Sequence, residues 1–138
     1  MAIQKWLFTV LLVLQAHFSA SYLVPLDSEA QREFGGLLRW VWPWSGGDSG
    51  LLGQVTMSSY PTTGIFLGGF AAVLFLLAAL AVLGYWVPID WWRVLAGGGA
   101  ILSLLLMAGF FGATKVLPMA LNLVVLWAVI TDWLPPTS

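Results

Sequence analysis

One long uncharged segment constrains the fold of this chain more than any other feature. Residues 63–87 hold no charged side chain over 25 positions. At 1.5 Å of helical rise per residue, about 20 residues cross the roughly 30 Å hydrocarbon core of a bilayer. The composition agrees, because 60% of the 138 residues are hydrophobic and only 8% are charged, against about 25% charged in soluble domains. The sequence therefore predicts an integral membrane protein.

Three further apolar segments predict additional membrane-spanning helices. They cover residues 6–26, 91–113 and 116–134, and very short breaks separate the last three of the four segments. Helices joined by short turns lie side by side. We therefore expect an all-α, polytopic membrane protein with four transmembrane helices in an antiparallel bundle, forming a single membrane domain over residues 1–138.

The first apolar segment has two possible roles. Its continuous apolar core, residues 6–14, has the length of a signal peptide core, but Phe18 stands three residues before a cut after Ala20, where a small residue is required. We therefore expect a retained span.

The orientation is weakly marked in the sequence. Lys5 and Arg93 would lie on one face of the membrane and Arg32, Arg39 and Lys115 on the other, so the positive-inside count does not separate the faces. Lys5 before the first span favours an amino terminus inside, and we expect a bacterial cytoplasmic membrane.

Residues 27–61 form a loop between the first two spans and carry six of the eleven charged residues. Asp27 or Ser28 is a suitable N-cap, and apolar residues recur at helical spacing up to Val41 before Pro43 ends the pattern. The loop is therefore predicted to contain an amphipathic helix on the membrane surface. Trp40, Trp42 and Trp44 lie around the end of this pattern, and we expect them to contact headgroups or a protein partner.

The same loop contains a string that resembles a protease motif. Residues 47–50 read "GDSG", as around the nucleophile of chymotrypsin-like proteases, but the sole histidine, His17, lies in the first span and cannot complete a triad with Ser49. Gly, Asp and Ser are common in turns, so a turn is the better interpretation. With zero cysteines and no metal-ligand cluster, phosphate-binding loop or basic cluster, we expect neither an enzyme nor a nucleic-acid partner.

Polar residues within the spans are the candidate ligand-binding residues: Gln15, His17 and Asn122. His17 has three possible functional roles: axial ligand of a tetrapyrrole, hydrogen-bond partner of a quinone, or proton relay. The simpler alternative is an interhelical hydrogen bond or a contact with a neighbouring protein. Asn122 is expected to pair with Gln15 or His17. We predict no cofactor in this chain alone, with a lipid, quinone or pigment shared with neighbouring subunits as the alternative.

Small residues recur every four positions in two of the spans and predict close helix packing. The alternative is that they make room for a ring or a lipid tail. The second span contributes Gly64, Gly68 and Ala72, and the third contributes Ala96, Gly97, Gly98, Gly99 and Ala100.

The layout resembles the DoxX-like group of small four-helix membrane proteins. The resemblance rests on "QAHFSASYLVPL" at the end of the first span, on "GGFAAVLFLLAALAVLGYWVPIDWWRVLAGGGAIL" across the middle hairpin and on "LPMALNLVVLWAVI" in the last. Members of that group are associated with membrane oxidoreductases that exchange electrons with quinones, which implies an accessory subunit here.

The functional expectation combines these points. We expect a non-catalytic accessory or structural subunit of a larger membrane complex, in an energy-transducing respiratory or photosynthetic electron-transfer system, with other membrane subunits and the bilayer as partners. The alternative is a quinone-, pigment- or haem-binding protein that uses His17. A small channel or transporter comes third, because the second and third spans have uncharged interiors.

Overall fold

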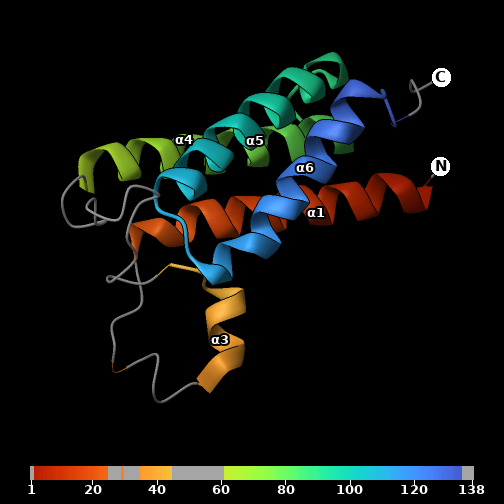
Figure 1. Cartoon of the computed structure of the whole chain (residues 1–138). Helices are drawn as coiled ribbons and strands as arrows, with labels where there is room; N and C mark the ends of the chain where they lie inside the picture. Colours follow the sequence, from red (N-terminus) through yellow and green to blue (C-terminus); the bar gives the residue numbers. More distant parts are fainter. Residues whose placement is uncertain (1, 25–28, 30–34, 45–60, 135–138) are drawn as a thin grey trace.

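A computed structural model describes residues 2–24, 29, 35–44 and 61–134 of the chain, and every regular element in these ranges is helical (Figure 1). The α-helices are α1 Ala2–Ala20, α3 Gly35–Val41, α4 Pro61–Leu83, α5 Trp92–Gly109 and α6 Val116–Ile130. Three short 3₁₀ helices join them: η1 Ser21–Leu23, η3 Ile89–Trp91 and η4 Ala113–Lys115.

Four helical segments are long and apolar enough to cross a membrane: Ile3–Leu23, Thr62–Leu83, Ile89–Gly109 and Ala113–Ile130. They confirm the all-helical prediction and support a multi-pass membrane protein. The last segment ends at Ile130 rather than at residue 134, where the span was predicted to end, and Asp132, with a positive φ of 50°, has left the helical conformation. The first begins at residue 3 rather than residue 6.

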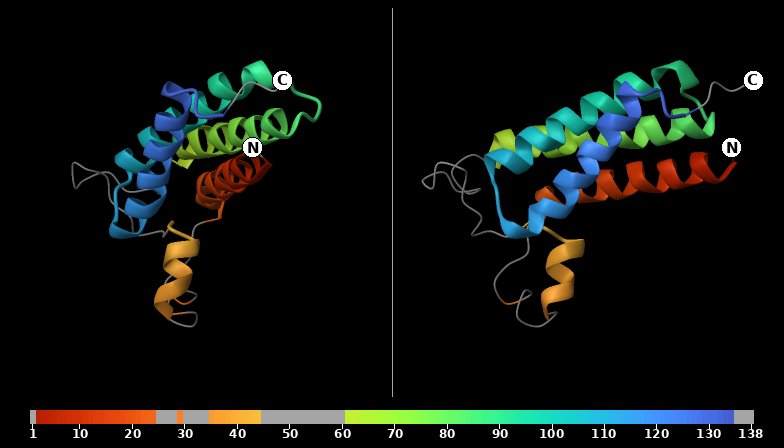
Figure 2. Two further views of the ribbon diagram at one scale, coloured as in Figure 1. Left: turned by 90° about the vertical axis from the view of Figure 1, so that its right-hand side faces the viewer. Right: turned by 45° about the vertical axis from the view of Figure 1, so that its right-hand side comes forward.

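The four long helices lie side by side (Figures 1 and 2). Helix α4 packs against both α1 and α5, α5 packs against α6, and α1 contacts α6 less extensively. Buried aromatic and aliphatic side chains from all four helices form the larger core, including Phe8, Leu12, Phe75, Trp92 and Val125. The α1–α6 contact is therefore the loosest one around the group.

The turn between α4 and α5 depends on one glycine. Gly84 adopts a φ of 79°, a conformation that residues with a side chain rarely adopt. Its N–H donates to the Ala81 carbonyl at 3.0 Å. Near the same end of the molecule, Arg93 at the start of α5 pairs with Asp132 after α6 at 3.5 Å. Both side chains are about half exposed, so this ion pair contributes little to stability.

Helix α3 stands outside the group of four (Figure 1) and runs across the direction of α1 (Figure 2). It corresponds to the last part of the predicted helix, whose residues 30–34 lie outside the described residues, and it ends before Pro43 as expected. The predicted N-cap, Asp27 or Ser28, lies outside the described residues, as do Arg32 and the "GDSG" string with Ser49.

Candidate functional site

Four polar side chains meet in the interior between α1, α5 and α6. Gln15 and Ser19 come from α1, Ser103 from α5 and Asn122 from α6, and all four are fully buried. The Ser19 hydroxyl donates to Ser103 Oγ at 3.1 Å, and Asn122 Nδ2 donates to the same oxygen at 2.9 Å. Ser103 is therefore the centre of a polar contact that links three helices.

Gln15 lies beside this cluster but bonds to backbone. Its Nε2 donates to the Pro118 carbonyl at 3.0 Å, one turn before Asn122 on α6. Asn122 thus pairs with Ser103, and the prediction that it pairs with Gln15 or His17 is wrong. Ser103 was missed because a serine within a long apolar run is compatible with many roles, and only the rotation of α5 turns it towards Asn122.

Two buried acceptors in this region have no partner among the described residues: Gln15 Oε1 and Asn122 Oδ1. A buried carbonyl oxygen without a donor costs about 1–3 kcal/mol. The cost of these two unpaired oxygens therefore offsets part of the stabilisation that the hydrogen bonds of the cluster give to the helix contacts.

His17 points away from this cluster, towards α3. Its Nε2 lies 2.9 Å from the Val41 carbonyl, so the neutral tautomer with a proton on Nε2 donates this bond. Its ring also meets the Trp42 ring edge-on, with 5.2 Å between centroids. His17 lies three residues before the end of α1. A haem, pigment or quinone bound through Nε2 would have to displace the Val41 carbonyl.

The loop tryptophans attach the segment after α3 to the end of α1. Trp42 Nε1 donates to the Val24 carbonyl and Trp44 Nε1 donates to the Phe18 carbonyl, each at 2.7 Å. Carbonyls near the end of a helix lack partners in the next turn. Trp42 thus binds a carbonyl just after η1, and Trp44 adds a second donor to the Phe18 carbonyl, which also accepts from Ser21 Oγ at 2.8 Å.

Trp44 is enclosed by this chain alone. It is fully buried, meets the Tyr22 ring edge-on at 4.9 Å between centroids, and has Lys115 Nζ 4.7 Å from its ring centroid. Thr114, next to Lys115, donates to the Pro43 carbonyl at 2.9 Å. The prediction that Trp44 contacts headgroups or a partner is wrong. Trp44 belongs to the core, because its ring is covered by the buried Lys115 ammonium group and its N–H donates to the Phe18 carbonyl.

The other two loop tryptophans differ in how much of their surface is exposed. Trp42 is half-buried against His17, whereas Trp40 on α3 keeps 47% of its surface exposed. Among the described loop residues, Trp40 and the exposed Val41 beside it are thus large apolar side chains available for an external contact.

The small residues of α4 face α1. A Cβ on Gly64 would overlap the Tyr22 ring, and one on Gly68 would lie 2.8 Å from the Ser19 carbonyl oxygen. Ala72, one turn further on, is buried. The space beside Gly64 is therefore filled by a side chain of this protein.

The small residues of α5 face two different helices. A Cβ on Gly99 would lie 3.2 Å from the Phe75 ring of α4, and Gly98 also faces α4. Gly97 faces Val129 of α6, at 3.5 Å from the Cβ position. Ala96 and Ala100 are fully buried. These residues let α5 approach both neighbours, and the Phe75 ring occupies the place that a ligand ring would need beside Gly99.

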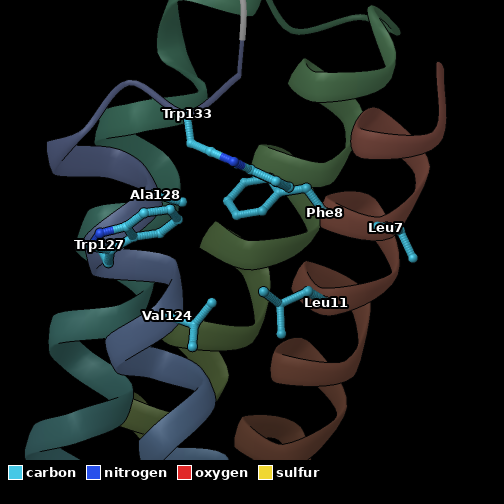
Figure 3. A pocket seen from close by; sticks show the side chains of 7 residues that line it. All are labelled: Leu7, Phe8, Leu11, Val124, Trp127, Ala128 and Trp133. Carbon is cyan, nitrogen blue, oxygen red and sulfur yellow. The ribbon is translucent and has the colours of Figure 1, made fainter. Parts of the chain in front are cut away.

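An apolar cleft lies between α1 and α6, where the four-helix group is least tightly closed (Figure 3). Its volume is about 140 Å³. The sequence did not predict this cleft, and its one signal is that Trp127 lies deeper in the apolar segment 116–134 than Trp133 does. The lining residues are Leu7, Phe8, Leu11, Val124, Trp127, Ala128 and Trp133.

The described residues contain no group of three or more His, Cys, Asp or Glu side chains placed to hold a metal ion. No family model, curated protein or solved structure matches this chain. The resemblance to the DoxX-like group therefore stays a prediction from the sequence.

Proposed function

We propose that this protein is a non-catalytic accessory subunit of a larger membrane complex. Its four apolar helices would cross the bilayer as an antiparallel bundle, and α3 would lie at the membrane surface and contact a neighbouring subunit. The DoxX-like resemblance directs the proposal to an electron-transfer complex of a bacterial cytoplasmic membrane, with the amino terminus inside.

The observation that carries this proposal is the way in which α3 is held. Three hydrogen bonds from residues 41–44 reach α1 and the residues just after it: His17 to the Val41 carbonyl, Trp42 to the Val24 carbonyl and Trp44 to the Phe18 carbonyl. The same segment leaves Trp40 and Val41 exposed. An ordered tryptophan on a pre-positioned helix loses little conformational entropy on binding, and tryptophan is enriched among the residues that dominate interface energies.

The interior of the bundle favours a structural role over chemistry. The buried polar side chains of α1, α5 and α6 bond to one another or to backbone, as residues that hold membrane helices together do. His17 Nε2 is engaged by the Val41 carbonyl. The nitrogen atoms that could have bound a ligand, Gln15 Nε2, His17 Nε2 and Asn122 Nδ2, thus already have structural partners, whereas Gln15 Oε1 and Asn122 Oδ1 have none among the described residues.

The test is to solubilise the native membrane gently, isolate the tagged protein and measure the size and composition of what copurifies. We expect a complex larger than the monomer, and Trp40→Ala should weaken it by at least about tenfold, as truncation of an interface hot spot does. Trp91→Ala is the matched control, because Trp91 is similarly exposed but belongs to η3, away from α3.

Two outcomes would argue against the proposal. A stable free monomer with no comigrating protein would exclude an accessory subunit. An intact complex in the Trp40→Ala protein would remove α3 from the contact and leave headgroup anchoring as the role of Trp40.

A further inference from the structure

The cleft between α1 and α6 has dimensions and chemistry that restrict what can enter it. Its lining consists of aliphatic and aromatic side chains, and its volume is about 140 Å³. An enclosed apolar cavity of about this size stays free of water and accepts a small apolar guest. A helix is roughly 10 Å across with its side chains, so even two turns of a partner helix would displace several times this volume. The cleft therefore fits a narrow apolar chain.

The cleft also lies at a definite depth in the membrane-spanning segments. Leu7 and Leu11 stand four and eight residues after Ile3, where the first segment begins, which corresponds to about 6–12 Å along the helix. On the other wall, Val124 and Ala128 stand six and two residues before Ile130, where the last segment ends, or about 3–9 Å. Both walls thus place the cleft within one leaflet, about 3–12 Å below the ends of the spans.

Trp133 bounds the cleft at its headgroup end (Figure 3). Its ring lies 6.1 Å from Phe8 and 6.4 Å from Trp127 between centroids, so aromatic rings from α1 and α6 and from the chain just after α6 surround one end. On the outer side the cleft is partly open, and Leu7 and Trp127 each expose more than half of their surface. An occupant can therefore enter sideways from the bilayer.

We propose that this cleft is a binding site for one acyl chain of a bilayer phospholipid, which it holds over the part of the chain between the headgroup and the terminal methyl group. The bilayer surrounds the opening with acyl chains at the concentration of a solvent, and filling the cleft restores the dispersion contacts that its lining otherwise lacks. A bound chain would then close the loosest contact of the four-helix group and couple α1 to α6.

The test uses the purified protein in phosphatidylcholine vesicles that contain a tracer phosphatidylcholine with a photoreactive diazirine in the upper part of one acyl chain. After illumination, labelled peptides are mapped by mass spectrometry. We expect labelling of Leu7 and Leu11 several-fold above that of Val94, which is 69% exposed and at a similar depth on α5 but outside the cleft. A tracer with the diazirine at the terminal methyl group should lose this preference.

A matched pair of variants separates a site from general solvation. Val124→Phe fills the cleft from its α6 wall and should lower the labelling of Leu7 and Leu11 several-fold. Leu123→Phe adds a ring on the same helix at an exposed position outside the lining and should change nothing. Circular dichroism of both variants checks that they retain the helical content of the parent protein.

Three results would overturn the proposal. Equal labelling of Leu7 and Val94, or equal labelling in the two variants, would mean that lipid merely solvates the surface. A second copy of the chain as the occupant would show itself through Leu7→Cys, because the protein has no cysteine of its own: disulfide-linked dimers at low protein-to-lipid ratio would exclude the acyl chain.

Discussion

Replacing Gly68 by alanine tests the close approach of α4 to the backbone of α1. The new Cβ would lie 2.8 Å from the Ser19 carbonyl oxygen, about 0.6 Å short of the 3.4 Å at which ordinary contact begins. That oxygen belongs to the backbone of α1 and cannot rotate away, so the two helices must separate. Overpacking of this kind costs about 1–3 kcal/mol. Gly69 is the internal control, because a Cβ there meets nothing within 4 Å.

Both substitutions gain the same helix propensity, about 1 kcal/mol at most, so this gain cancels when the two variants are compared. We expect Gly68→Ala to be less stable than Gly69→Ala by about 1–3 kcal/mol. Reversible unfolding in mixed micelles, followed by circular dichroism, measures both free energies of unfolding. If the two variants agree within about 0.5 kcal/mol, the usual scatter of surface substitutions, the close approach of α4 to the Ser19 carbonyl does not exist.

Two further predictions concern the polar contacts. Ser103→Ala leaves Asn122 Nδ2 with only the weak Met107 sulfur acceptor, at 3.8 Å, and should lower the free energy of unfolding by about 1–2 kcal/mol. Adding Asn122→Leu should restore most of this loss, because it also removes the unpaired Oδ1. A double-mutant cycle in the same assay would contradict this if the two losses simply added. His17→Ala removes the bond to the Val41 carbonyl and should speed amide hydrogen exchange in α3 by up to about tenfold, without changing exchange in the long helices. His17→Gln keeps a donor, so its exchange rates in α3 should lie closer to those of the parent protein. Equal exchange in all three proteins would mean that this bond does not hold α3.

The membrane-length helices were predictable because the signal is local. A run such as residues 63–87 excludes charge over a length that matches the bilayer, and the cost of placing a charge in hydrocarbon does not depend on what the helix packs against. The end of α3 before Pro43 was predictable for the same reason, since proline restricts the residue that precedes it. The partner of Asn122 could not be predicted from the sequence, because α4, α5 and α6 are apolar on most sides and carry no strong signal for how each helix is rotated about its axis.

The sequence by itself determined that this protein is helical, that four of its helices are long and apolar enough to span a membrane, and that small residues line two of them. Tertiary structure alone decided that Trp44 is buried under Lys115 while Trp40 stays exposed, that His17 faces α3 rather than the polar cluster, and that α1 and α6 leave an apolar cleft. The first group depends on the transfer of single segments from water to lipid. The second depends on which faces of different segments meet, and alternating tryptophans with equal hydrophobicity carry no information about that choice.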